Sequence, residues 1–71
     1  MRKFAERLKE LRAEAGLSIM ALGKAIGVSD ATICRWENGV SDIKSDQLVA
    51  LAEFFSVSTD DLLDFEGKFH K

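Results

Sequence analysis

The sequence predicts a compact all-α domain of five short helices, on three observations. Apolar residues recur at the three- and four-residue spacing of helices, and no alternating run predicts a strand. The 71 residues include no proline, so no helix interior is interrupted by one. A chain of this length makes one domain, and its single cysteine forms no intramolecular disulfide. We therefore expect one small apolar core to hold the helices together.

The first helix is predicted over residues 3–15. Its inward face carries apolar residues at positions i, i+4, i+7 and i+11, namely Phe4, Leu8, Leu11 and Ala15. Gly16 is expected to end this helix, and Ser18 is expected to cap the second helix.

Two short helices separated by Gly27 are predicted within residues 17–39. Gly27 suits the positive φ of a helix C-cap, and Ser29 follows it as an N-cap. The inward faces of the two helices carry apolar pairs at helical spacing, Leu22 with Ile26 and Ile33 with Trp36. Because the connection is short, the third helix should cross the second steeply and leave its outer face free. This is the pattern of a helix-turn-helix, and that outer face is the candidate site.

The third helix is followed by an irregular loop over residues 40–44. Asn38 and Gly39 are expected to stop the third helix. Ser41 or Asp42 is expected to cap the fourth helix.

The fourth helix should end near Ser56. Its inward stripe consists of four apolar residues: Leu48, Leu51, Ala52 and Phe55. Ser58, followed by Asp61 three residues later, predicts a capping box at the start of a short fifth helix. This last helix carries Leu62 and Leu63.

Charge is distributed unevenly along the chain, whose formal net charge is −2 at pH 7. Residues 1–39 carry seven Lys or Arg and five Asp or Glu, a balance of +2, whereas residues 40–71 carry three and seven, a balance of −4. Phosphate repels an acidic surface, so a nucleic acid should approach the N-terminal half. We assign residues 1–64 to the domain and residues 65–71 to a C-terminal tail.

Several classes of protein are not indicated by this sequence. It has no signal peptide and no apolar stretch near the ~18 residues of a membrane span, which predicts a soluble cytoplasmic protein with no membrane partner. It shows no nucleophile–base pair, phosphate-binding glycine loop or metal-ligand spacing, so we expect no enzyme, no metal and no cofactor. No small-molecule ligand is indicated either.

The chain resembles the Cro- and phage-repressor-type helix-turn-helix domains. The resemblance covers roughly residues 4–63 and is carried by Leu17-Ser18, Leu22, Gly27-Val28-Ser29, Ile33 and Trp36-Glu37-Asn38-Gly39. It implies a five-helix, lambda-repressor-like DNA-binding domain that regulates transcription. It also implies a homodimer on double-stranded DNA, with two recognition helices in successive major grooves of a two-fold symmetric operator, about 34 Å apart.

The resemblance implies a DNA-binding role for nine residues. Those at or near base edges are Ser29, Asp30, Ala31 and Arg35. Those near the phosphate backbone, or at the start of the second helix, are Ser18, Ile19, Lys24, Thr32 and Asn38. The helical wheel agrees, because burial of Ile33 and Trp36 leaves four residues on the outer arc of the third helix: Asp30, Ala31, Cys34 and Arg35.

Three positions depart from the resembled family. Ile19 stands where glutamine is common, and isoleucine forms no hydrogen bond to phosphate or base. Residues 40–44 read Val-Ser-Asp-Ile-Lys where the family's loop is commonly basic and ends in proline, which predicts weaker anchoring to the DNA backbone. Gly23 replaces the usual alanine within the second helix, at about 1 kcal/mol of helix propensity.

Several residues admit a structural role as well as a functional one. Arg35 is either a guanine reader through O6 and N7 or a solvated charge. Asp30 either accepts from cytosine N4 or stabilises the start of its helix. Arg12 and Glu37 match positions that form a largely buried ion pair in the resembled family, and the alternative is two surface charges.

Cys34 is either an ordinary thiol or a redox-sensitive one, and His70 has no indicated catalytic or metal role. The fifth helix and the tail are the predicted dimer interface, since exposed aromatic side chains tend to be buried by partners. The predicted contacts are Leu62, Leu63, Phe65 and Phe69. The alternative is a frayed tail.

The sequence therefore predicts a sequence-specific DNA-binding transcriptional regulator. The alternative is a protein-interaction module of the same fold, such as an antitoxin or anti-repressor. In that case Asp30, Ile19 and the loop would direct the same surface toward another protein. The unfavourable charge balance keeps this alternative open.

Overall fold

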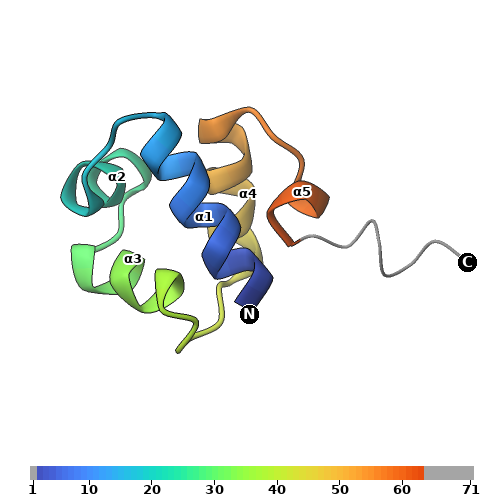
Figure 1. Cartoon of the computed structure of the whole chain (residues 1–71), viewed down its shortest axis with the longest axis horizontal. Coiled ribbons are helices and arrows are strands. Elements are labelled where there is room, and N and C mark those ends of the chain that lie inside the picture. The colour runs from blue at the N-terminus through green and yellow to red at the C-terminus, as the bar shows by residue number, and fades with distance from the viewer. Residues whose placement is uncertain (1, 64–71) are drawn as a thin grey trace, which may run out of the picture.

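The computed structural model describes residues 2–63, with side chains from residue 4 onward. Within this range five helices follow one another: α1 (Arg2–Glu14), α2 (Ile19–Ile26), α3 (Asp30–Glu37), α4 (Ser45–Phe55) and α5 (Thr59–Leu63) (Figure 1). No strand occurs among the described residues. The predicted five-helix, all-α fold is therefore confirmed. Within the described range, no helix is both long and apolar enough to cross a membrane.

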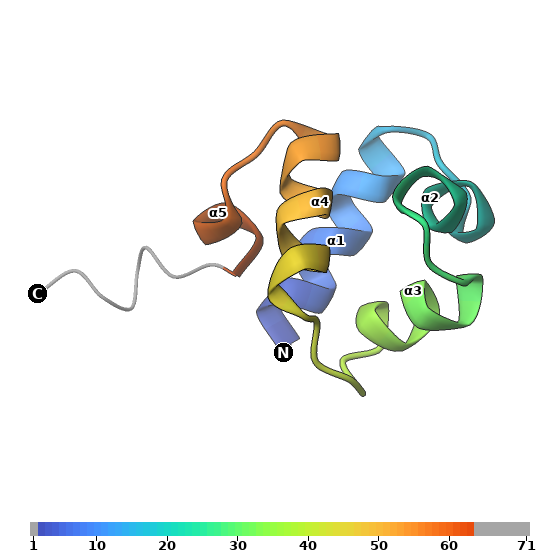
Figure 2. The same cartoon turned by 180° about the vertical axis from the view of Figure 1, so that it is seen from behind.

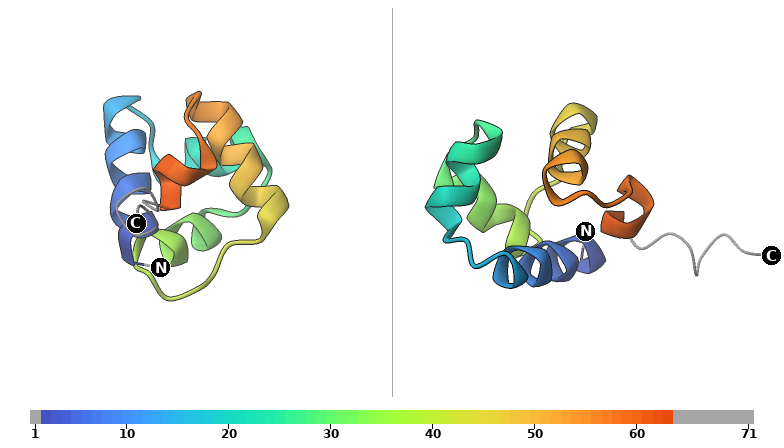
Figure 3. Two further views of the ribbon diagram at one scale, coloured as in Figure 1. Left: turned by 90° about the vertical axis from the view of Figure 1, so that its right-hand side faces the viewer. Right: turned by 90° about the horizontal axis from the view of Figure 1, so that it is seen from above.

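α1 lies along the front face of the molecule in the view of Figure 1. It packs against α3 on one side and α5 on the other (Figure 1). α2 packs against α3, and α4 lies on the opposite face, where it contacts α2 and α5 (Figures 2 and 3). The helix-turn-helix formed by α2 and α3 thus occupies one end of the molecule, away from α5.

One apolar core receives side chains from all five helices. Seven of them are almost completely buried: Phe4, Leu8, Leu22, Ile33, Trp36, Leu51 and Leu62. The rings of Phe4 and Trp36 meet edge to face, with centroids 6.3 Å apart. Such a pair adds about 0.5–1.5 kcal/mol to the burial of its area. It fixes α3 against the start of α1.

The predicted caps of α2 and α3 are confirmed. Ser18 Oγ accepts from the backbone N–H of Ala21 at 3.0 Å, and Ser29 Oγ accepts from that of Thr32 at 3.1 Å. Between the helices, Gly27 has a φ of +80°, which residues with a side chain rarely adopt. These caps satisfy N–H groups that the first turn of a helix leaves unpaired, so α2 and α3 need only a three-residue connection.

The predicted loop over residues 40–44 is confirmed, but the predicted N-cap of α4 is wrong. Its N-cap is Lys44, not Ser41 or Asp42. The physical reason is Ile43, whose side chain packs against the core and keeps the preceding loop out of the helix. The lysine side chain has no acceptor for the N–H groups of the first turn, but Gln47 Oε1 accepts from the backbone N–H of Lys44 at 3.2 Å, which is the other bond of a capping box.

Two smaller expectations are also corrected. Ala15 is exposed rather than buried, because α1 ends before it and the chain turns at Gly16. Ser58 Oγ accepts from the backbone N–H of Asp61 at 3.0 Å, as a capping box requires. The carboxylate of Asp61 does not complete the box, since it binds Arg7 instead.

An ion pair joins the first helix to the last. Arg7 Nε donates to Asp61 Oδ1 at 3.0 Å, and Arg7 Nη2 donates to Asp61 Oδ2 at 2.9 Å. Arg7 Nη1 also donates to Glu10 Oε1 at 3.0 Å. The hydrogen bonds to Asp61, and then to Glu10, raise the pKa of Arg7 above its ordinary value. Together with buried Leu62, this pair holds α5 against α1.

Candidate nucleic-acid interface

The turn between α2 and α3 contains a very close approach of two backbone segments at Gly23. A Cβ atom added there would lie 2.7 Å from the carbonyl oxygen of Val28, 3.4 Å from Ser29 C and 3.5 Å from Asp30 N. All three neighbours are backbone atoms, so they cannot move aside without displacing the start of α3. The structure thus requires a small residue at Gly23, which corrects its interpretation as a simple loss of helix propensity.

α3 presents two chemically different faces. Ile33, Trp36 and Glu37 are buried against the rest of the domain. The opposite face is exposed and carries Asp30, Ala31, Cys34, Arg35 and Asn38. Because α2 and α3 lie at the edge of the molecule, no other described helix covers this face (Figure 1).

The polar side chains at the start of α3 bond to their own helix. Ser29 Oγ and Thr32 Oγ1 lie 2.9 Å apart, within hydrogen-bonding distance. Asp30 Oδ1 accepts from the backbone N–H of Ala31 at 2.9 Å. A carboxylate in the first turn stabilises a helix both by such a bond and by its charge. This geometry favours the helix-start role of Asp30 over the reading of cytosine.

Arg35 is exposed on the outer face of α3. It lies one turn after Ala31, and among the described residues no hydrogen bond or ion pair holds its guanidinium. Farther along the same face, Asn38 Nδ2 donates to Cys34 Sγ at 3.6 Å. Lys24, on α2, is also exposed and adds a second cation to the helix-turn-helix.

The start of α2 is mostly apolar. Ser18 is exposed, but Ile19 is half-buried and packs against the core, so its side chain serves folding more than contact with DNA. Met20 is 58% exposed, and Val40, in the loop after α3, is 68% exposed. The sequence analysis did not single out these two residues as exposed apolar side chains. Their positions outside the inward apolar stripes are the signal that would have predicted their exposure.

Arg12 and Glu37 form an ion pair with two hydrogen bonds, on the buried side of α3. Arg12 Nε donates to Glu37 Oε2 at 2.6 Å, and Nη2 donates to Oε1 at 3.0 Å. The hydrogen bond to Glu37 raises the pKa of Arg12. Arg12 Nη1 donates to the carbonyl oxygen of Leu17 at 2.9 Å. One side chain of α1 therefore holds both the end of α3 and the residue that precedes Ser18.

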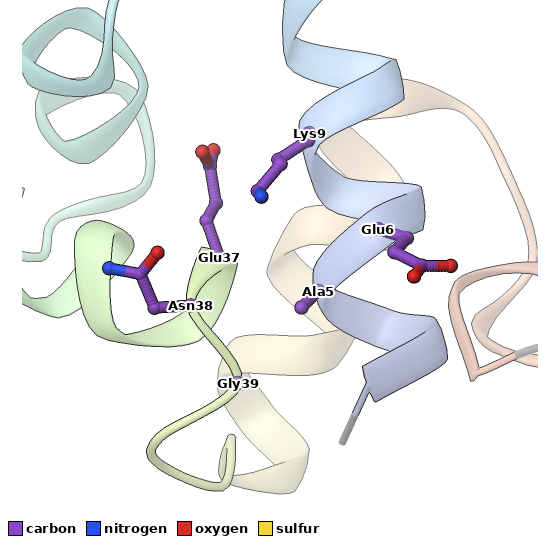
Figure 4. A pocket seen from close by; sticks show the side chains of 6 residues that line it. All are labelled: Ala5, Glu6, Lys9, Glu37, Asn38 and Gly39. Carbon is purple, nitrogen blue, oxygen red and sulfur yellow. The ribbon is translucent and has the colours of Figure 1, made fainter.

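A shallow pocket lies beside this ion pair, between α1 and the end of α3 (Figure 4). Its volume is about 390 Å³, and it is lined by Ala5, Glu6, Lys9, Glu37, Asn38 and Gly39. Lys9 is directed toward Glu37, whereas Glu6 is directed away from the pocket (Figure 4). Because Arg12 already binds the carboxylate of Glu37, we assign no ligand to this pocket.

One predicted dimer contact is corrected by the structure. Leu62 is fully buried in the core of its own chain, so its side chain is not available to a partner. Leu63 is half-buried and packs against the same core. Phe65, Phe69 and His70 lie outside the described residues. In the part of the chain that the structure describes, no three metal-ligating side chains come together.

Comparison with known proteins connects this geometry to a family. A family model described as helix-turn-helix matches residues 8–62. The chain is 34% identical over 64 residues to the HTH-type transcriptional activator BcrR of Enterococcus faecalis, a match that covers 90% of this chain and 31% of that protein. It is 34% identical over 58 residues to Repressor protein C2 of Salmonella phage P22, covering 82% of this chain and 27% of that protein. The chain thus spans about three-tenths of the length of these relatives.

Solved structures share the fold. The P22 c2 repressor in complex with a synthetic operator matches with a TM-score of 0.81 and 31% identity, over 87% of this chain and 94% of that chain. Hydroxypropylphosphonic acid epoxidase from S. wedmorenis matches with a TM-score of 0.78 and 31% identity, over 86% of this chain but 32% of that chain. The fold therefore occurs both in a repressor bound to its operator and as part of a larger enzyme.

Proposed function

This chain belongs to the helix-turn-helix family of Cro- and phage-repressor-type domains, and we propose that it is a sequence-specific DNA-binding transcriptional regulator. In this proposal α3 enters the major groove of double-stranded DNA, and the chain catalyses no reaction. The names of its relatives, a transcriptional activator and a repressor protein, support this function.

The observation that carries the proposal is the free outer face of α3. Its exposed residues are small or flexible, and Arg35 has no partner among the described residues. A helix of this kind fits the major groove, which is about 12 Å wide. The close approach at Gly23 and the ion pair at Glu37 hold α3 at both ends, so its face is presented in one fixed position.

Contacts to phosphate are proposed around this face, from Ser18, Lys24, Thr32 and Asn38. Ser18 Oγ accepts a hydrogen bond within its cap, so its hydroxyl proton is free to donate to a phosphate oxygen. Phosphate contacts of this kind set the register of a domain on the duplex, and base contacts set its specificity.

A homodimer is part of the proposal, because one copy of α3 reads little sequence. Its eight residues span about 12 Å, the height of three or four base pairs. Two copies related by a two-fold axis would place their α3 helices in successive major grooves about 34 Å apart. The length of sequence read would then double.

Binding to random duplex DNA at two salt concentrations tests the proposal. We expect a mobility shift at about 50 mM salt that weakens steeply by about 200 mM, because contacts to phosphate release counterions. A protein-interaction module such as an antitoxin or anti-repressor would show no salt-sensitive binding to DNA. That outcome would overturn the proposal.

Arg35→Ala is expected to weaken binding to a preferred operator by about 1–3 kcal/mol and to relax the preference at one base pair of each half-site. Selection from a random duplex library, followed by titrations of single-base variants, measures both effects. Lys24→Ala is the control, because loss of a phosphate contact lowers affinity for all sequences alike. Unchanged affinity and unchanged preference in Arg35→Ala would contradict this role.

Asp30→Asn is expected to raise the affinity for all duplexes, by about fivefold, since one repulsive charge a few ångströms from phosphate is worth about 1 kcal/mol in water. The asparagine oxygen still accepts from the N–H of Ala31, so the thermal stability should hardly change. Fluorescence anisotropy with preferred and random duplexes measures the affinities. A fall in operator affinity at unchanged stability would instead show that Asp30 reads a base.

A further inference from the structure

The outer face of α3 also indicates which bases it contacts. We propose that the methyl group of Ala31 packs against the 5-methyl group of a thymine, in the same half-site in which Arg35 binds a guanine. This inference rests on the proposed function and assigns a base type to the centre of the reading face.

The polar side chains that surround Ala31 are already engaged within the chain. Asp30 Oδ1 accepts from the N–H of Ala31 itself, and the hydroxyls of Ser29 and Thr32 lie 2.9 Å apart. Ala31 itself has no side-chain donor or acceptor, so it contacts a base through its methyl group alone. Beside it, the guanidinium of Arg35 has no hydrogen bond or ion pair with any described residue.

Ala31 and Arg35 lie close together along the helix. Four residues of α-helix correspond to about 6 Å along its axis, and successive base pairs rise 3.4 Å. The two side chains therefore meet base pairs one or two steps apart. Cys34 is exposed beside them, three residues after Ala31, and its sulfur extends the apolar surface.

The chemistry of the major groove supplies the matching bases. Thymine carries a methyl group on its groove edge, and alanine contacts that methyl without needing a hydrogen bond. Guanine presents O6 and N7, which accept two hydrogen bonds from one guanidinium. Cytosine carries only a hydrogen at C5, so it would leave the methyl group of Ala31 without this contact. The half-site should thus contain a thymine and a guanine within about two base pairs.

Replacement of thymine by deoxyuridine tests this inference, because the two differ only by the methyl group. A preferred operator is first selected from a random duplex library, and its thymines are then replaced one at a time. At one thymine of each half-site the full-length chain should bind the uracil duplex about fourfold more weakly, the value of one buried methyl group. Ala31→Gly should bind the two duplexes equally. The ratio of the two affinities compares one variant with itself, so any loss of folding cancels.

Ala25→Gly is the matched control, since it makes the same change at an exposed position of α2. It should keep the fourfold ratio. If no uracil replacement changes the affinity of the parent chain, or if Ala31→Gly keeps the ratio, the inference is wrong while DNA binding stands. If the library yields no preferred, salt-sensitive sequence, the proposed function itself fails.

Discussion

Replacement of Arg12 by methionine is expected to lower the free energy of unfolding by about 3–5 kcal/mol. The change leaves the carboxylate of Glu37, only 5% exposed, without either of its two guanidinium hydrogen bonds. Methionine keeps much of the aliphatic length of arginine, so the loss reflects charge and hydrogen bonding more than a cavity. The carbonyl of Leu17 loses its side-chain donor as well. Equilibrium unfolding in urea, followed by circular dichroism, measures the effect.

Arg7→Met is the matched control. The pair of Arg7 with Asp61 is also two-bonded and also starts from α1, but its side chains are 29% and 35% exposed. Water replaces a lost partner at such a site, so the expected loss is about 1 kcal/mol or less. Equal losses in Arg7→Met and Arg12→Met would show that the burial of Glu37 contributes little to the stability of the domain.

Gly23→Val is expected to lower the free energy of unfolding by about 3 kcal/mol and to abolish DNA binding by molecules that remain folded. Its Cβ would lie 2.7 Å from the carbonyl oxygen of Val28, and relief of that contact moves the start of α3. The gain in helix propensity on replacing glycine is about 1 kcal/mol at most, so the steric term decides the sign. The free energy of unfolding of Gly23→Ala should fall between those of the parent chain and Gly23→Val. Unfolding in urea and mobility shifts of the same samples measure both effects.

Gly27→Ala separates this contact from ordinary backbone strain. At Gly27 an added Cβ meets no heavy atom within 4 Å, and the only penalty comes from its φ of +80°. We expect a loss of about 1–2 kcal/mol there. If Gly23→Val were as stable as the parent chain, the two backbone segments would be free to separate, and the fixed placement of α3 would lose its main support.

The helix boundaries could be predicted because their signals are local. Ser18, Gly27 and Ser29 each act within one turn of the chain, so a pattern of a few residues is sufficient. The N-cap of α4 is different. It depends on where the side chain of Ile43 finds the core, and that core is built by residues far away in the sequence.

In the candidate site, too, local features could be predicted from the sequence, and features that depend on the path of the chain could not. The exposed arc of α3 follows from periodicity, because burial of Ile33 and Trp36 fixes the opposite side of the helix. The close approach at Gly23 requires the path of the chain in space. So does the burial of Leu62, since α5 has five residues and is too short for periodicity to distinguish it from Leu63.

The contact between α1 and α5 also sets an order of events while the chain is being made. Asp61 follows Arg7 by 54 residues, whereas α2 and α3 are neighbours in sequence. During synthesis at about 5–20 residues per second, roughly 3–11 s pass between the addition of Arg7 and that of Asp61. Until that interval is over, the side of α1 that packs against α5 has no α5 to cover it.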